Sequence, residues 1–430
     1  MSNTNSKDLL KSQRFDFMAK LLYLYSYDNK LETDFFKDLY ENHMITFNGC
    51  KELPDRTIDG CGITKNNIHD FFKEFHSLIE NMKHNGFDPS YAIPVGTDGL
   101  LENGTHRMIT SYYYNIPPAI KRVTSPGQRY NYNFFLGRSG FPPLNRKYAD
   151  AMALEYVNHN SNTRCMILYP CAYNEQAIFN VFNIIQKYGE IYYHKEVKLN
   201  HIGLNNVIKE LYRGEEWIGG NFPITGAYGK YKLSCFPCNP IIYISIVMND
   251  VSKCIEMKEE CRKIYNMGKH SLHVSDFTED TWRISSCLLN ENSIHFLNNC
   301  KTNVVNNHPN NMSINTKNTL TTFFETVNTN KKDYCITSSV ILEMYGLRHA
   351  KDIDYLHKSN FDVKKENIGV HEGIWLSYYG HTKDDIIYNP ENHFYFNGFK
   401  FAAPHVIEKM KKNRNEAKDQ TDIALLTRIL

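Results

Sequence analysis

Apolar residues recur at helical spacing in the first part of the chain. They cluster between residues 8 and 48, and again between residues 65 and 85, and this predicts two helical regions. Residues 91–95 form a short apolar run before a turn and predict a strand, while residues 107–114 again predict a helix. We therefore expect a unit of mixed helix and strand over residues 1–155.

A regular alternation of strand and helix patterns begins near Arg164. Strands are predicted at 165–168, 191–199 and 241–248, and helices at 174–188, 202–213 and 250–266. Such alternation is typical of layered α/β domains. We expect one over residues 160–300.

Residues 301–318 interrupt this pattern, because Asn, Lys, Thr and Ser dominate and apolar residues are nearly absent. This composition is typical of a linker, which we place at residues 301–330. The third unit, residues 331–430, opens with strand, helix and strand patterns. The chain is thus predicted to be a multidomain protein of the α/β and α+β classes.

The composition is that of a globular protein, with 42% hydrophobic and 22% charged residues. The formal net charge of +2 argues against a nucleic-acid partner or a polybasic membrane anchor. The eleven cysteines are scattered, with C-x-x-C spacing only at Cys235 and Cys238, which favours reduced thiols. No apolar run matches a membrane span or a signal peptide. We expect a cytoplasmic protein.

The segment from Ser338 to Asp354 has the residue types of a metal-dependent nucleotide site. Asp352 and Asp354 lie two positions apart in a predicted strand, which places both carboxylates on one face, about 7 Å apart along the chain. Two such carboxylates suit Mg²⁺, which bridges triphosphate oxygens and neutralises developing charge. Ser338 and Ser339, at the predicted start of a helix, and Lys351 are candidates to bind the nucleotide.

This order of a small-residue turn, a helix and an Asp-x-Asp strand resembles the nucleotidyltransferase superfamily over the whole third unit. The resemblance implies a nucleotidyltransferase fold and a third acid on a later strand, for which Glu372 and Asp385 are the candidates. Thr337 stands where the family usually has Gly. Residues 409–414 and 418–423 resemble the basic helix and the K-D-x-x-D-I segment that pack beside the site in stand-alone members.

A second phosphate-binding pattern lies near residue 104, where a strand and a turn precede Gly104, Thr105, His106 and Arg107 at a predicted helix start. Glycine permits close backbone approach, and helix amides with an arginine bind phosphate. The pattern resembles the ParB/sulfiredoxin-like fold, with Asn103 in place of the usual Asp. Some members are small-molecule kinases with an upstream catalytic Glu. Glu52 stands at a matching place and is the candidate general base.

The middle unit resembles nucleoside diphosphate kinase, through the order of its elements and the sequence from His273 to Asp276. The resemblance implies ferredoxin-like layers and a phosphoryl-carrying His273, with Tyr212 and Arg262 at phosphate-binding positions. Three positions depart from the family: Tyr169 replaces a Lys, Val274 replaces a Gly, and His270 replaces an Asn. A degenerate unit that acts as a scaffold is the favoured alternative.

Together these patterns predict a fused enzyme that combines a nucleotide-dependent phosphotransferase with a nucleotidyltransferase. Its substrates would be ATP or another nucleoside triphosphate, and a small hydroxylated or phosphorylated molecule such as a precursor of a surface glycan. Two alternatives stay open. One is a nucleotidyltransferase that modifies a protein or a tRNA, and the other is a non-catalytic nucleotide-binding protein.

Overall fold

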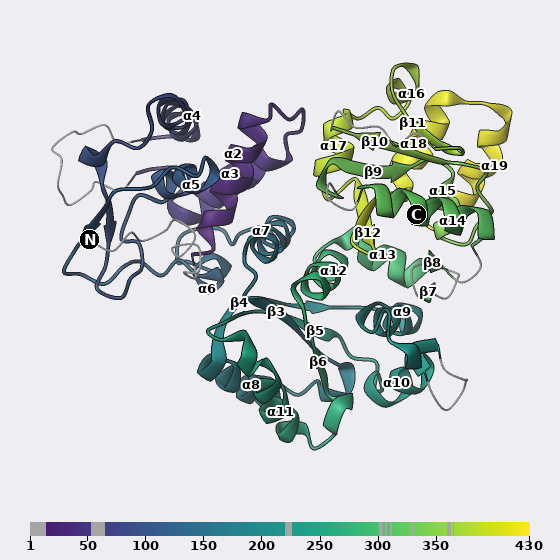
Figure 1. Cartoon of the computed structure of the whole chain (residues 1–430), viewed down its shortest axis with the longest axis horizontal. Coiled ribbons are helices and arrows are strands. Elements are labelled where there is room, and N and C mark those ends of the chain that lie inside the picture. The colour runs from purple at the N-terminus through teal and green to yellow at the C-terminus, as the bar shows by residue number, and fades with distance from the viewer. Residues whose placement is uncertain are drawn as a thin grey trace. The chain divides into compact units, whose positions relative to one another are not determined.

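The structure is a computed structural model that describes residues 14–52, 65–219, 226–300, 312–327, 331–358, 363 and 365–430, with two short strands at β7 (Val304–Val305) and β8 (His308–Pro309). The chain divides into two compact units, Met1–Asn160 and Ser161–Leu430. Both mix helices with sheets (Figure 1), as the predicted fold class requires. No helix in these ranges is long and apolar enough to cross a membrane.

The first unit is mainly helical. Its elements are α2 (Asp16–Asp28), α3 (Phe35–Asn48), α4 (Ile68–Asn85), η1 (Pro89–Tyr91), β1 (Ile93–Val95), α5 (Thr105–Tyr113), β2 (Ile120–Arg122), α6 (Tyr132–Leu136) and α7 (Arg146–His159). The predicted helical region 8–48, where it is described, consists of two helices. Helix α2 ends at Asp28 with Asn29 as its C-cap, and Lys30 then takes a left-handed backbone conformation. Strands β1 and β2 pair in parallel.

Aromatic side chains fill the core of the first unit. Tyr23 of α2 stacks on Tyr40 of α3 with ring centroids 4.9 Å apart, and both rings pack against Phe72 and Phe75 of α4. The apolar residues that predicted these helices therefore face one another. Burial of such large rings is the main force that holds the three helices together.

The middle part of the second unit is an antiparallel sheet in the order β4-β5-β3-β6. Helices α8 and α11 pack side by side over one face of it (Figure 1). The elements are β3 (Thr163–Leu168), η2 (Pro170–Ala172), α8 (Glu175–Tyr188), β4 (Gly189–Val197), α9 (His201–Leu211), η3 (Glu216–Gly219), α10 (Gly226–Ser234), β5 (Ile241–Met248), η4 (Val251–Lys253), α11 (Cys254–Tyr265), η5 (Gly268–His270), β6 (Leu272–Val274), α12 (Thr278–Leu288) and α13 (Glu291–Asn299). Every strand predicted between 165 and 248 is present.

The last part of the second unit is a mixed sheet in the order β11-β10-β9-β13-β12. Its elements are α14 (Ile314–Val327), η6 (Lys331–Asp333), β9 (Tyr334–Thr337), α15 (Val340–Met344), β10 (Ile353–His357), β11 (Ile368–Val370), α16 (Ile374–Ser377), α17 (Lys383–Tyr388), β12 (His393–Phe396), β13 (Phe399–Ala402), α18 (Pro404–Arg414) and α19 (Ala417–Leu426). Strand β10 pairs antiparallel with β9 and parallel with β11.

Within the predicted linker at residues 301–330, the structure has the short strands β7 and β8 and, over residues 314–327, helix α14. Helix α14 buries Leu320, Phe323 and Phe324, and the Phe324 ring stacks on Phe399 of β13 at 3.9 Å. These apolar side chains are too few to stand out among the polar residues around them, yet their helical spacing puts them on one face. Helix α13 also packs on β12, so the two sheets belong to one unit.

Candidate functional site

The turn between β9 and α15 has an unusual backbone. Ser338 adopts φ 67°, a left-handed conformation that side chains rarely take, and the residue is buried. The amide of Ile341 bonds to the Ser338 carbonyl, and the amide of Leu342 bonds to the Ser339 carbonyl. The predicted small-residue turn is therefore present, and its left-handed position is at Ser338 rather than Thr337.

The two aspartates of the Asp-x-Asp pattern differ in their environment. Asp354 lies in β10, opposite Thr337 of β9, and is half-buried. Asp352 and Lys351 precede the strand and are exposed. The predicted strand therefore begins later than expected and leaves Asp352 outside it, because the ladder between β10 and β11 begins at Ile353.

A chain of close polar contacts links Asp354 to the turn. His371 Nε2 lies 3.2 Å from Asp354 Oδ2, and His371 Nδ1 lies 2.6 Å from the Tyr379 hydroxyl. That hydroxyl also lies 2.7 Å from Thr337 Oγ1. Burial raises the pKa of Tyr379, and the Asp354 carboxylate adds to the shift. Sequence reasoning chose Glu372 instead of its neighbour His371, and it missed Tyr379, which belongs to no expected motif.

The two candidates for a third acid do not contact Asp354. Glu372 is largely exposed and pairs with Lys383 at 3.3 Å. Asp385 pairs with His381 at 3.0 Å. Within the described ranges, no three His, Cys, Asp or Glu side chains are grouped as ligands of one metal ion. Of the two predicted metal ligands, Asp354 lies 3.2 Å from His371 Nε2, whereas Asp352 is exposed and lies near the Arg348 guanidinium, whose pKa it helps to raise.

A buried network of ion pairs holds the last two helices against the loop between α15 and β10. Arg348 donates two hydrogen bonds to Asp422, at 2.5 and 2.6 Å, and Lys411 lies 2.6 Å from the same carboxylate. Arg414 and Lys411 pair with Asp419. Burial alone would raise the pKa of Asp419, but hydrogen bonds from Arg414 and the Glu416 amide lower it to about 2. Residues 418–423, singled out in the sequence, therefore brace this loop.

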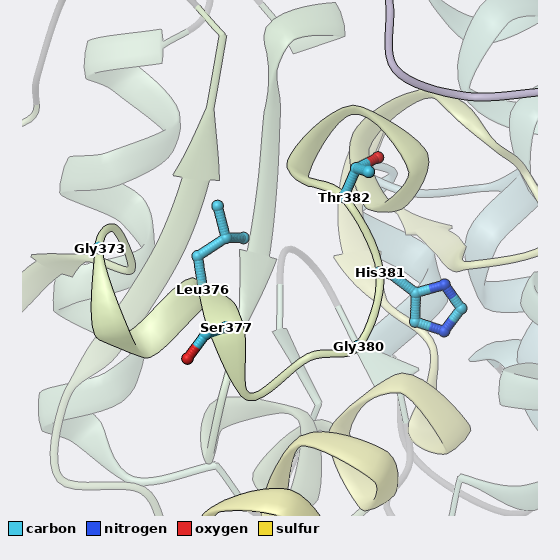
Figure 2. Close-up of a pocket in the computed structure, with 6 residues that line it drawn as sticks. All are labelled: Gly373, Leu376, Ser377, Gly380, His381 and Thr382. Atoms are coloured by element: carbon cyan, nitrogen blue, oxygen red, sulfur yellow. The ribbon is translucent and has the colours of Figure 1, made fainter.

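An open pocket of about 500 Å³ lies between α16 and the start of α17. Figure 2 shows Leu376 and Ser377 on one side and His381 and Thr382 on the other. The exposed side chain of Trp375 lies in the same helix, α16, and its indole stacks on His371 with an angle of 14° between the planes. No sequence motif indicated this pocket.

His273 of the middle sheet is buried among aromatic rings. Its imidazole packs edge-on against Tyr212 at 4.9 Å, and the Tyr169 hydroxyl donates to the Tyr212 hydroxyl. Burial, followed by the nearby Lys258, lowers the pKa of His273 to about 3. Asp276, the last residue of the sequence that resembles nucleoside diphosphate kinase, lies 3.6 Å from Lys258.

Lys230 of α10 is the charged centre of the same group of side chains (His273, Tyr169, Tyr212 and Lys230), here called the His273 cluster. Its ammonium lies over the rings of Tyr169 and Tyr212, at 4.9 and 5.6 Å, and donates to a backbone carbonyl. Burial, followed by the nearby Arg262, lowers the pKa of Lys230 to about 8. No carboxylate within the described ranges pairs with Lys230. Sequence reasoning missed this lysine because α10 lies outside every motif.

The predicted phosphate site of the first unit is occupied by the chain's own side chains. Gly104 is left-handed, with φ 85°, and the Arg107 guanidinium folds back over it while donating to the Tyr91 carbonyl. At the start of α5, Thr105 Oγ1 accepts a hydrogen bond of 2.7 Å from the buried Arg14.

His106 and Glu52 are also engaged. His106 Nε2 lies 2.8 Å from the Tyr40 hydroxyl, and burial, followed by Lys20 and Lys65, holds the pKa of His106 well below its usual range. Glu52 pairs with Lys65 at 2.9 Å. Lys65 pairs with Glu52 and also lowers the pKa of His106. Among the described residues, no direct contact joins Glu52 to His106.

The chain matches no protein-family model, no curated protein and no solved structure.

Proposed function

We propose that this chain transfers phosphorus-containing groups from nucleotides, with a nucleotidyltransferase site at Asp354. The observation that carries the proposal is the antiparallel register of β9 and β10, which pairs Asp354 with Thr337 beside the Ser338 turn. A carboxylate next to a turn that leads into a helix is suited to hold a cation and a phosphate together.

The arrangement around this pair supports the same function. The sheet order β11-β10-β9 and the antiparallel pairing of β9 with β10 fit the layers that the nucleotidyltransferase resemblance implies. Helices α18 and α19 pack against α15, as the tail of stand-alone members would.

A divalent cation, expected to be Mg²⁺, would neutralise charge on the triphosphate when bound. Asp354 fits the role of ligand, since its carboxylate contacts no lysine or arginine within the described ranges. Glu372 and Asp385 do not fit, because other side chains hold them. The protein's own part is therefore to fix the Asp354 carboxylate beside the turn.

The phosphotransferase half of the proposal rests on the middle sheet. Its order β4-β5-β3-β6 is that of ferredoxin-like layers, which the nucleoside diphosphate kinase resemblance implies. Lys230 and Arg262 supply positive charge near His273. The low pKa of His273 keeps the imidazole neutral, which is the form that a nucleophile needs.

Transfer from labelled nucleotides tests the proposal. The full chain is incubated with α-³²P and γ-³²P nucleoside triphosphates, a divalent cation and a cell extract. We expect Asp354→Asn to lower transfer of the α-phosphate at least 100-fold, since a charge that binds the cation is lost. Glu325→Gln, in an exposed part of α14, is the matched control.

The acceptor that takes the label separates the alternatives. Label on a small molecule supports the fused enzyme, and label on protein or tRNA supports the modifying enzyme. Nucleotide binding without transfer supports the non-catalytic alternative. Equal transfer by Asp354→Asn and by the control would exclude Asp354 as the site.

A further inference from the structure

The geometry around Asp354 directs its carboxylate toward His371. Gly369 lies opposite Asp354 in the parallel ladder, and a β-carbon at Gly369 would lie only 2.8 Å from Asp354 Oδ1. The ladder continues past β11, because the His371 amide donates to the Tyr355 carbonyl at 2.9 Å. One carboxylate oxygen therefore lies over the glycine, and the other lies 3.2 Å from His371 Nε2.

The tautomer of His371 decides what Nε2 presents to Asp354, and the 2.6 Å contact between Nδ1 and the Tyr379 hydroxyl is compatible with a proton on Nδ1. If His371 Nδ1 donates to the Tyr379 hydroxyl, that hydroxyl donates to Thr337, and Nε2 presents a lone pair to Asp354. A lone pair and a carboxylate oxygen repel each other unless a cation lies between them. Two ligand atoms that each lie about 2.0–2.2 Å from one metal ion are separated by roughly the 3.2 Å found between His371 Nε2 and Asp354 Oδ2.

We propose that Asp354 and His371 are the protein ligands of one divalent cation, with the imidazole standing where the resemblance expects a third acid. The inference rests on the proposed function. An imidazole ligand favours Mn²⁺, Co²⁺ or Zn²⁺ over Mg²⁺, which prefers an all-oxygen shell. Two protein ligands leave the remaining coordination positions to water and to triphosphate oxygens.

The second contact of His371 is what a metal-binding histidine requires. A ligating imidazole donates its other N–H to an acceptor that fixes the ring, and loss of that acceptor weakens metal binding 10–100-fold. Tyr379 is fully buried and supplies this acceptor, so it is a positioning residue. His371 itself is only 10% exposed, which leaves the ring little freedom to turn.

Calorimetric titration of the nucleotide-free full chain with MnCl₂, ZnCl₂ and MgCl₂ tests the inference. We expect Mn²⁺ and Zn²⁺ to bind at least tenfold more tightly than Mg²⁺. His371→Gln should weaken Mn²⁺ binding at least tenfold relative to the wild type. His371→Asp, which supplies an oxygen ligand, should bind Mg²⁺ more tightly than the wild type does. The matched control is His381→Gln, which removes another histidine paired with an aspartate and should leave Mn²⁺ affinity unchanged.

The remaining outcomes decide between the two proposals. Mn²⁺ binding through His371 without any nucleotidyl transfer would keep the metal site and reject the proposed function. Transfer with Mg²⁺ that His371→Gln leaves unchanged would reject the metal site and keep the function. Absence of Mn²⁺ and Zn²⁺ binding at millimolar concentration, or a proton on Nε2 in ¹⁵N spectra of the metal-treated protein, would overturn the inference. Thermal melts of each variant identify those that fold.

Discussion

The Asp354 site and the His273 cluster, both in the second unit, differ in how their charges are paired. Beside the Asp354 site, five charged side chains are paired in one network: Arg348, Lys411, Arg414, Asp419 and Asp422. In the His273 cluster, Lys230 is buried against aromatic rings and a carbonyl, and the charges nearest to it, Arg262 and Lys269, are also positive. The first arrangement uses charge to hold helices in place, and the second leaves positive charge uncompensated.

The difference teaches which of these charges stabilise the fold. Removal of one partner from a buried ion pair leaves an uncompensated charge, whereas an unpaired buried charge is uncompensated from the start. An unpaired buried cation is therefore retained at the expense of stability. The two regions should therefore respond oppositely to substitution and to pH.

The largest expected effect is that of Asp419→Ala. The substitution leaves Lys411 and Arg414 buried without this carboxylate, so we expect the free energy of unfolding to fall by about 3–5 kcal/mol. Urea denaturation monitored by circular dichroism measures the change. The control is Lys253→Gln, which removes an exposed ion pair with Glu256 and should cost less than about 1 kcal/mol. Equal losses in both variants would contradict the contrast.

The next effect is a gain in stability at alkaline pH through Lys230. The pKa of Lys230 is about 8 in the folded state, below its ordinary value of 10.5, so the unfolded chain binds more protons between these values. Stability therefore rises as pH increases from 8 to 10.5, by about 3 kcal/mol from this residue. The difference between wild type and Lys230→Gln in urea midpoints across this range isolates the contribution. A difference that is flat with pH would show that Lys230 is not buried as a free cation.

Asp419 stabilises the fold over a different pH range, above its folded pKa, and its contribution is lost in acid. Its folded pKa of about 2 lies below the ordinary 3.8. Its contribution of about 2 kcal/mol is present above pH 4 and is lost as pH falls toward 2. Comparison of wild type with Asp419→Asn in acid titration measures it. The exposed Glu325→Gln variant should follow the wild-type curve.

The smallest effect comes from one substitution made in both regions. Tyr379→Phe leaves His371 and Thr337 without their shared partner and should cost about 2 kcal/mol. Tyr212→Phe removes only the acceptor of the Tyr169 hydroxyl and should cost about 1 kcal/mol. Thermal or urea denaturation of the two variants gives the ratio. A larger loss of stability for Tyr212→Phe would show that the hydrogen bonds of the His273 cluster contribute more than those around Tyr379.

Only some regular elements of the second unit follow from periodicity, namely those whose apolar faces are long enough to read: β3, β4, β5, α8, α9 and α11. Strand β5 has the predicted bounds 241–248, and α8 starts one residue after its predicted start at 174. Helices α10, α12, α13 and α14 were missed; in α14 only a few large side chains on one face stand among polar residues. The strand expected around Asp352 starts only at Ile353, where its ladder with β11 begins.

The side chains of the candidate sites were harder to predict than the elements that hold them. Asp354 could be found because its spacing follows a strand and a turn. His371, Tyr379 and Lys230 come from segments far along the chain, and only tertiary packing brings them to Asp354 and His273. Local pattern contains no information about such contacts.

The left-handed backbone of Ser338 has a consequence for how the chain moves. A side chain in that conformation costs about 1–2 kcal/mol relative to the ordinary helical backbone, and helix α15 begins directly after it with single hydrogen bonds to Ile341 and Leu342. Glycine takes this backbone conformation without that cost. Ser338→Gly is therefore expected to slow local opening at the start of α15, and amide hydrogen exchange of the variant and the wild type measures the difference.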